Sequence, residues 1–153
     1  MEANSASRAA QSVELATLFS DLVRLETEVW DLVDRRLNRD HDLPLSWFEL
    51  MQVIGRVPNC RVADIAEALS ITVGGTSKLV DRIEQAGWCR RAPNPRDARS
   101  SVLALTRAGR RRLDAARGSF EDELEILLGT ALPPERLAAF ASTMRDVRRH
   151  IAD

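Results

Sequence analysis

Residues 61–106 decide the fold, and they read RVADIAEALSITVGGTSKLVDRIEQAGWCRRAPNPRDARSSVLALT. At the start of this stretch, Ile65, Ala66 and Leu69 recur at spacings of three and four residues, which places them on one face of a helix. The spacing therefore predicts a short helix that buries this face against the rest of the chain.

A second helix is predicted between Thr72 and Gly87. Ile71 is expected to fill the turn before it, and the Thr72 hydroxyl can cap it by accepting hydrogen bonds from free backbone N–H groups of its first turn. Gly87 supplies the left-handed residue that commonly ends a helix. The apolar residues expected on its buried side are Leu79, Val80, Ile83 and Ala86. Two helices joined in this way are typical of a helix-turn-helix.

Two short strands are predicted after the second helix, at residues 88–92 and 101–105. They flank the segment PNPRDARS, in which Pro and Asn favour a turn while Arg96 and Arg99 project from it. A helix that enters the major groove, with a basic hairpin beside it over the backbone and minor groove, is an arrangement that reads DNA. The sequence therefore predicts a winged helix-turn-helix.

The run LVDRIEQAGWCRRAPNPRDARSSVLALTRAG, residues 79–109, resembles the MarR family of multiple-antibiotic-resistance-type regulators. The pattern of that family is roughly LVDRLE-x-x-G, a strand, a D-x-x-D-x-R wing, a second strand and LT-x-x-G. This chain has Asn94 where the family often has an acid, and Gly74-Gly75 where bulkier polar residues are more usual. The resemblance implies a homodimeric, sequence-specific DNA-binding transcriptional regulator, a repressor released by a small-molecule ligand.

The fold expected is mainly α with a small β-hairpin wing, a winged helix-turn-helix plus a helical dimerisation layer. Residues 1–153 are expected to form one such domain, with dimerisation helices at 12–40 and 107–153 around a DNA-binding lobe at 45–106. Apolar residues on two adjacent faces predict a long first helix over residues 13–37. Further helices are expected from Trp47, capped by Ser46, from Arg107, capped by Thr106 and running to about Ala131, and from the pair Pro133 and Pro134.

Charge is distributed unevenly along the chain. The formal net charge is −1, but residues 61–112 carry +6, whereas residues 1–60 carry −4 and residues 113–153 carry −3. A local positive potential is expected of a phosphate-binding face, although it is also compatible with an uneven solvated surface. No apolar stretch long enough for a signal peptide or a membrane span is evident, so we expect a cytoplasmic protein with no membrane partner.

Enzymatic, cofactor and metal chemistry find no support in the sequence. The two histidines, His41 and His150, and the two cysteines, Cys60 and Cys89, lie apart from one another, without the spacing of a zinc site. No histidine accompanies a nucleophile, and the phosphate-binding Walker spacing is absent. The cysteines are expected to be small buried residues. We therefore expect a protein that is not an enzyme and that needs no cofactor or metal.

The candidate DNA contacts are residues at the start of the second helix and arginines beyond it: Thr72, Val73, Gly74, Gly75, Thr76, Ser77, Lys78, Arg82, Arg96 and Arg99. Each glycine costs a helix about 1 kcal/mol relative to Ala, so the pair either permits close backbone approach to DNA or is merely tolerated in a first turn. Arg96 is the candidate for the minor groove. The resemblance implies that Asp97 supports the wing by pairing with an arginine such as Arg99, and the alternative is a solvated turn acid.

The partners expected are double-stranded DNA with a pseudo-palindromic operator, a second copy of the chain and a small aromatic or phenolic effector. The resemblance places the effector between the first helix, the Trp47 helix and the lobe, and the candidate residues there are Trp30, Trp47, Met51 and Glu49. The alternative is that the tryptophans belong to the core. A winged helix also serves protein contacts, so a protein–protein interaction module without DNA binding is the alternative function. The arginine-bearing wing favours DNA.

Overall fold

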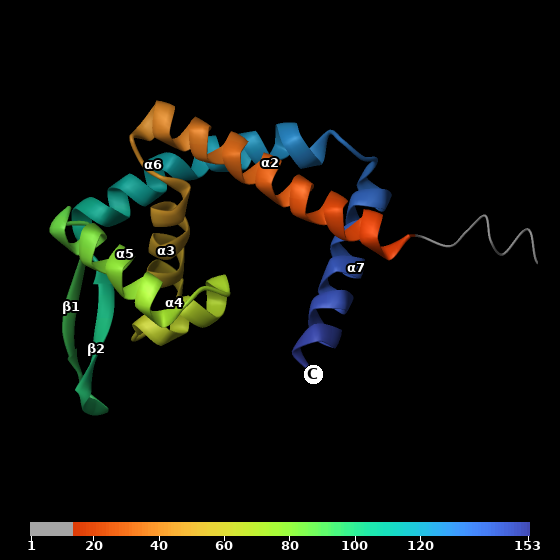
Figure 1. The fold of residues 1–153 in the computed structure, drawn as a ribbon. Coiled ribbons are helices and arrows are strands. Elements are labelled where there is room, and N and C mark those ends of the chain that lie inside the picture. Colours follow the sequence, from red (N-terminus) through yellow and green to blue (C-terminus); the bar gives the residue numbers. More distant parts are fainter. Residues whose placement is uncertain (1–13) are drawn as a thin grey trace, which may run out of the picture. The chain divides into compact units, whose positions relative to one another are not determined.

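The computed structural model of the chain describes residues 14–153 (Figure 1). They divide into two units, one ending at Leu32 and one spanning Val33–Asp153, and helix α2 (Leu15–His41) begins in the first and ends in the second. The start of the predicted 12–40 segment lies outside the described residues. The expectation of a mainly α fold with one hairpin is confirmed, while the division into dimerisation helices and a DNA-binding lobe stays a prediction.

The first unit consists of the N-terminal part of α2. Its large apolar residues are exposed in the single chain, including Leu15, Phe19 and Val23, with Phe19 at 68% exposure. Such residues at helical spacing are expected to bury against another surface. Among the described residues, these apolar side chains stay exposed.

The second unit holds the core. Helix α3 (Leu45–Arg56) crosses it, and its residues Phe48 and Met51 are fully buried, as is Leu37 near the end of α2. The rings of Phe48 and Phe120 lie 4.7 Å apart. The predicted Ser46 cap is wrong. The helix begins at Leu45, two residues before the predicted Trp47, and the backbone N–H of Leu45 donates to Asp34 Oδ1 at 2.8 Å.

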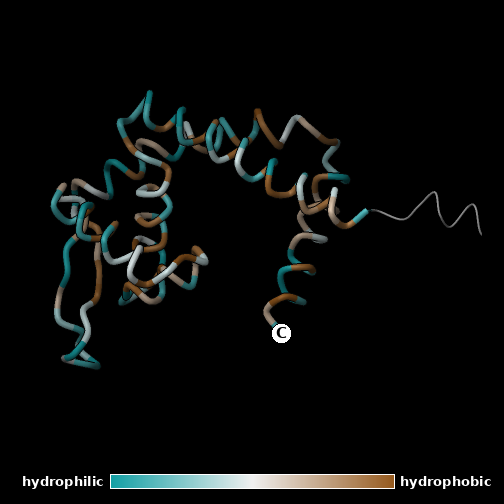
Figure 2. The backbone as a smooth tube through the Cα atoms, viewed as in Figure 1, coloured by the Kyte–Doolittle hydropathy of each residue, from teal (hydrophilic) through white to brown (hydrophobic). Residues whose placement is uncertain are grey.

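The helix-turn-helix comprises α4 (Val62–Leu69) and α5 (Val73–Gln85). Ile65 and Ala66 are buried, as predicted, and so are Val80 and Ile83. Two expected core positions are wrong, because Ala86 and Ile71 are exposed, Ile71 by 41%. The colours along α5 change between apolar and polar (Figure 2), and its buried residues Thr76, Val80 and Ile83 recur at spacings of four and three, as on one face of an amphipathic helix.

The wing is an antiparallel hairpin of β1 (Cys89–Asn94) and β2 (Asp97–Leu105), in which Cys89 pairs with Leu105 and Arg91 with Leu103. Both strands are longer than predicted, since the turn occupies only Pro95 and Arg96. The backbone N–H of Leu103 donates to the Cys60 carbonyl at 2.7 Å, which attaches the base of the wing to the loop before α4.

Three helical segments complete the chain. Helix α6 (Arg107–Leu124) passes directly into a wider π-helical turn, η1 (Glu125–Gly129), near the predicted end at Ala131. Helix α7 (Pro134–Ala152) begins at the predicted prolines, and its apolar residues Met144, Val147 and Ile151 are exposed. Like the start of α2, this face is uncovered in the single chain.

Candidate nucleic-acid interface

The N-terminal turn of α5 is built from a capped, small-residue start. The Thr72 hydroxyl accepts a hydrogen bond from the backbone N–H of Gly75 at 3.1 Å, which confirms the predicted cap. A Cβ at Gly75 would lie 3.0 Å from this hydroxyl, whereas a Cβ at Gly74 would meet nothing within 4 Å. Cap packing therefore accounts for Gly75, while Gly74 leaves an open surface beside the exposed side chain of Val73.

Thr76 does not belong to this surface. It is fully buried, and its hydroxyl donates to the Thr72 carbonyl at 2.8 Å. The prediction of a DNA contact through its side chain is wrong, because Thr76 lies on the same buried side as Val80 and Ile83, one and two turns further along. Position in the first turn alone does not decide which side chains face outward.

The remaining predicted helix residues lie on the accessible side. Lys78 and Arg82, four residues apart and therefore on one face, are both exposed, and Ser77 is half-buried. Within the described part of the chain, neither basic group forms an ion pair with a carboxylate. Both charges are thus available to an external anion such as a phosphate.

The tip of the wing is organised by two short polar side chains. Asn94 accepts a hydrogen bond from the backbone N–H of Arg96 at 3.0 Å and donates to the Ser100 hydroxyl at 2.9 Å. Asp97 accepts from the backbone N–H of Arg99 at 3.0 Å. The carboxylate thus bonds the backbone of Arg99 where the resemblance implied its guanidinium. Both arginine side chains are exposed, and Asn94 bonds the turn where the family often has an acid.

A residue that sequence reasoning missed connects the wing to α5. The Arg91 guanidinium pairs with Asp81 at 2.7 Å and with Glu84, and its backbone N–H donates to Glu84 Oε1 at 3.0 Å. Asp81 and Glu84 are spaced three residues apart on α5, so both can face one partner. That spacing is visible in the sequence, and the signal that separates Arg91 from Arg90 is strand alternation, because Arg91 shares a face with the buried Cys89.

The end of α5 and the start of α6 share one threonine. The Thr106 hydroxyl accepts from the backbone N–H of Gly109 at 3.0 Å, as the predicted cap requires, and donates to the Gly87 carbonyl at 2.7 Å. Gly87 has φ +77°, which confirms the left-handed end of α5. The backbone N–H of Thr106 donates to the Trp88 carbonyl at 3.0 Å. The two helices are therefore held together by hydrogen bonds within a few residues.

Arg112 of α6 joins this junction to the end of α2. Its guanidinium lies 4.3 Å from the centre of the Trp88 ring, and one of its nitrogens donates to the carbonyls of His41 at 2.6 Å and Asp42 at 2.9 Å. Trp47 packs edge-on against Trp88, with ring centres 5.3 Å apart. Arg112 and Trp47 hold Trp88 from two elements.

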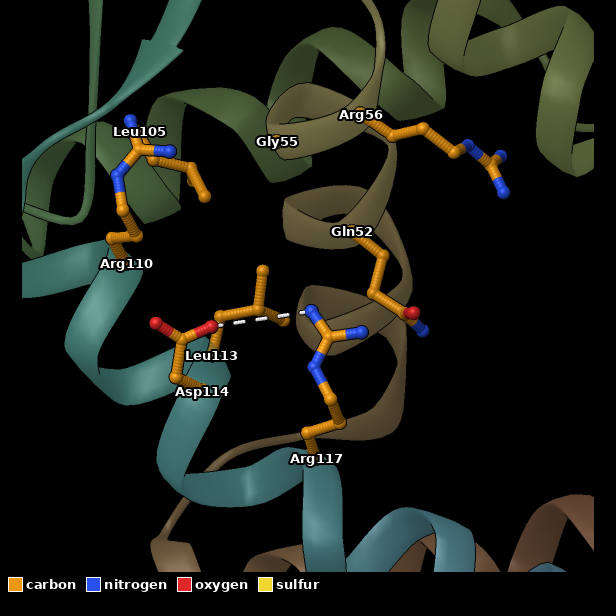
Figure 3. A pocket seen from close by; sticks show the side chains of 8 residues that line it. All are labelled: Gln52, Gly55, Arg56, Leu105, Arg110, Leu113, Asp114 and Arg117. Atoms are coloured by element: carbon orange, nitrogen blue, oxygen red, sulfur yellow. Dashed lines mark ion pairs between the residues drawn. The ribbon is translucent and has the colours of Figure 1, made fainter.

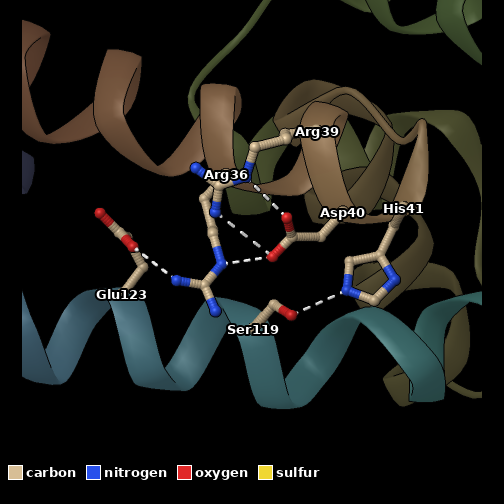
Figure 4. A network of polar contacts seen from close by, with 6 residues as sticks. All are labelled: Arg36, Arg39, Asp40, His41, Ser119 and Glu123. Atoms are coloured by element: carbon tan, nitrogen blue, oxygen red, sulfur yellow. Dashed lines mark hydrogen bonds and ion pairs between the residues drawn. The ribbon is translucent and has the colours of Figure 1, made fainter.

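Polar contacts fix the C-terminal end of α2 on α6 as well (Figure 4). Arg36 pairs with Asp40 at 2.5 Å and with Glu123 at 3.4 Å, and the His41 ring shares a hydrogen bond of 2.8 Å with the Ser119 hydroxyl. Hydrogen bonds from Arg39 and Arg36 hold the pKa of Asp40 below its usual value. These contacts tie the part of α2 that belongs to the second unit to the middle of α6.

Three of the predicted effector residues, Trp47, Glu49 and Met51, lie on α3 in the second unit. Met51 is fully buried and Trp47 packs on Trp88, which favours the alternative that they are core. Burial raises the pKa of the Glu49 carboxyl, which lies 3.4 Å from the Gln52 amide nitrogen. Trp30 belongs to the first unit. The predicted aromatic pocket stays a prediction.

A different hollow of about 360 Å³ lies between α3, the end of β2 and α6 (Figure 3). Its floor is apolar, from Gly55, Leu105 and Leu113, and its rim is polar. The rim residues are Gln52, Arg56, Arg110, Asp114 and Arg117. Arg117 and Asp114 form a 3.9 Å ion pair across one turn of α6. The residues that line the hollow thus include three arginines and one aspartate. This composition suits a small organic anion with an apolar body.

The cysteines and the remaining chemistry-bearing groups behave as structural residues. Cys60 and Cys89 are buried free thiols, and burial raises the pKa of each to about 11, so they are protonated at neutral pH. Among residues 14–153 no three His, Cys, Asp or Glu side chains gather as metal ligands.

No helix in that range is long and apolar enough to cross a membrane.

Comparison with known proteins finds relatives among transcriptional regulators. The MarR family model matches residues 41–100, which include α3, α4, α5 and most of the wing. The HTH-type transcriptional regulator YfiV of Bacillus subtilis is 26% identical over 102 residues, which span 65% of this chain but only 62% of YfiV. The multiple antibiotic resistance protein MarR of Escherichia coli is 29% identical over 98 residues, 60% of this chain and 68% of MarR.

Solved structures extend the likeness over most of the chain. Sco3205, a MarR family transcriptional regulator from Streptomyces coelicolor determined in complex with DNA, superposes with a TM-score of 0.82 at 26% identity, covering 91% of this chain and 89% of its own. These relatives are transcriptional regulators, in agreement with the prediction that the chain is not an enzyme. In its capped α5 helix, its arginine-bearing wing and its sequence over residues 41–100, the chain is similar to the MarR family.

Proposed function

We propose that this chain is a MarR-family regulator, a homodimer that binds a specific DNA operator and acts as a repressor. The observation that carries the proposal is the joint exposure of the α5 start and the wing arginines in one unit, with Lys78 and Arg82 on the helix and Arg96 and Arg99 on the hairpin. The likeness to Sco3205 in complex with DNA supports it. On this arrangement α5 enters the major groove and Arg96 the adjacent minor groove.

The dimer follows from the uncovered apolar faces. Residues such as Leu15 and Phe19 on α2 and Val147 on α7 are half or more exposed in the single chain, and burial of such area is the main source of association energy. A closed two-fold dimer presents two copies of α5 in opposite senses, so the preferred DNA is a pseudo-palindrome. The half-site centres then lie about one helical turn, roughly 10 base pairs, apart.

A gel-shift titration at several salt concentrations tests the proposal. The probe is a duplex that the protein itself selects from a random-sequence pool, and inserting five base pairs between the half-sites rotates one by about half a turn. We expect binding that weakens steeply with salt and is lost on insertion. Failure to select any duplex would favour the protein–protein interaction module, and full-strength binding after insertion would contradict the symmetric dimer.

We further propose that a small aromatic or phenolic anion releases the protein from its DNA. The arginine-rimmed hollow beside α6 supports it, because its apolar floor and positive rim match an aromatic carboxylate or phenolate. Benzoate, phenol and cyclohexanol, tested separately for a rise in melting temperature and for release of DNA, separate the need for charge from the need for an aromatic ring. Arg117→Ala is the matched variant. If none of the three compounds acts, the effector is of another class, while the DNA result stands.

A further inference from the structure

We propose that Arg91 is a positioning residue for DNA recognition: it clamps the wing onto the recognition helix and so fixes the angle at which both meet the duplex. The inference rests on the proposed function, because an angle between two reading elements matters only if both contact DNA. Arg91 is not among the predicted DNA contacts, and its guanidinium is already paired with carboxylates of the protein itself.

The clamp joins one residue of β1 to two acidic positions of α5. Arg91 Nη2 lies 2.7 Å from Asp81 Oδ1, and Nη1 bonds Glu84 Oε2. The backbone N–H of Arg91 donates to the other oxygen of the Glu84 carboxylate at 3.0 Å. Glu84 is therefore held by both the side chain and the backbone of the same residue. Charge-assisted hydrogen bonds of this kind are roughly twice as strong as neutral ones and are directional.

The alternation of a strand explains why Arg91 and not its neighbour makes this contact. Side chains two residues apart share a face, and Cys89, two residues before Arg91, is buried with its thiol 3.9 Å from the Val80 carbonyl of α5. Arg91 continues that face, with 26% of its side chain exposed. Arg90 lies on the opposite face and is exposed.

The wing needs such a support because a two-stranded hairpin is marginally stable by itself. Its base is held by buried residues of both strands, including Leu103. Beyond Arg91, the side-chain hydrogen bonds described for the hairpin, such as those of Asn94 with Ser100 and Asp97 with Arg99, stay within the wing. Arg91 is therefore the outermost of these links between β1 and α5, and a small rotation there would displace the tip where Arg96 lies.

The charges of Asp81 and Glu84 allow the clamp to be distinguished from its alternative, a direct contact between Arg91 and a DNA phosphate. If Arg91 acted as a phosphate contact, removing the two carboxylates would free it and tighten DNA binding. Under the clamp, the same change loosens the wing and weakens binding. Asp81→Asn with Glu84→Gln preserves the shape of both side chains and makes the lobe more positive by two charges, so the two accounts predict changes of opposite sign.

The experiment measures affinity for the duplex selected by the wild-type protein, at several salt concentrations. We expect this double variant, in which both acids become amides, to bind about fivefold more weakly in spite of its added positive charge, the scale of one or two partly exposed ion pairs. Arg91→Ala should weaken binding without changing the slope of log K against log salt. Arg90→Ala is the control, and if it loses a phosphate contact its slope falls by about one. Arg91→Lys should be intermediate, because an ammonium lacks the two-pronged geometry.

A second measurement needs no DNA. Trypsin cleaves after arginine, and the tip arginines Arg96 and Arg99 are exposed, so the double variant should be cut at the wing faster than the wild type at an unchanged melting temperature. Equal or tighter DNA binding by the double variant, a reduced salt slope for Arg91→Ala, or an unchanged rate of wing cleavage would each overturn the clamp. A wild-type protein that selects no duplex would instead overturn the proposed function, and the cleavage rates would still decide whether the wing is clamped.

Discussion

A methyl group added to Gly109 would lie 1.9 Å from the carbonyl oxygen of Trp88. This oxygen also accepts the backbone N–H of Thr106 at 3.0 Å, so it cannot retreat without breaking a hydrogen bond. The first turn of α6 can therefore approach the start of the wing only where the side chain is a hydrogen atom. The LT-x-x-G motif, ending at Gly109, has its physical reason in this contact.

Gly109→Ala should destabilise the fold by about 1 to 3 kcal/mol, the usual cost of forcing extra volume into a packed site. Gly118→Ala, on the same helix, is the matched control, since its Cβ would meet nothing within 4 Å. This control should stabilise the protein by about 0.4 to 1 kcal/mol. Denaturant unfolding of the three proteins measures both effects. Equal stability of Gly109→Ala and the wild type would show that the junction can relax.

Arg96→Ala should weaken operator binding and leave the melting temperature nearly unchanged, because an exposed residue at a hairpin tip supports little of the core. The slope of log K against log salt should fall by about one if Arg96 contacts a phosphate, and by less if it acts through groove shape. Arg148→Ala, exposed on α7, is the control and should change neither quantity. Unaltered affinity at every salt concentration would remove Arg96 from the interface.

Cys60 and Cys89 should resist thiol reagents in the native protein at pH 8 and react only on unfolding. Burial raises the pKa of both thiols to about 11, from 9.0 in the absence of burial. Because the folded state then holds its protons more tightly, the thiols favour folding below about pH 9, and stability falls as the pH rises from about 9 to about 11. Cys60→Ser with Cys89→Ser, which lacks these thiols, is the comparison for the alkaline pH series. Rapid labelling at pH 8 without unfolding would contradict the burial of the two thiols.

The proposed dimer should dissociate when the exposed face of α7 is made polar. Met144→Glu with Val147→Glu places charges at two positions that are 45% and 51% exposed in the single chain. The charges should leave the fold of one chain unchanged and destabilise only an interface that buries them. Arg145→Ala on the same helix is the control. Sedimentation should show a monomer for the double variant and a dimer for the control. A double variant that remains a dimer would place the interface elsewhere.

The helix caps and helix ends of residues 61–109 were predictable from the sequence because they depend on residues close together in the chain. Thr72 and Thr106 cap helices that begin one residue later, and Gly87 has the positive φ expected of it. Ser46 failed as a cap because Asp34, on another helix, satisfies the start of α3 from outside. Local patterns predict a helix start well only when no distant side chain competes for it.

The rest of the site depends on which side chains meet in space. Thr76 has the composition of a DNA contact but lies on the core side of α5, and Ile71 has the composition of a core residue but is exposed. The pairing of Arg91 with Asp81 and Glu84 becomes evident only from the distances in the structure. Charge counted along the chain therefore located the basic lobe but could not separate charges available to DNA from charges used within the protein.

The single residue between β2 and α6 also sets a rule for engineering. Thr106 alone connects Leu105 to Arg107, and three residues connect α5 to β1, so neither joint can change length without shifting a reading element. The turn at Pro95 and Arg96 connects β1 to β2 only, so its length does not set the position of a helix. Redesign of sequence preference should therefore keep both joints at their present length and place insertions or grafted residues at the wing tip.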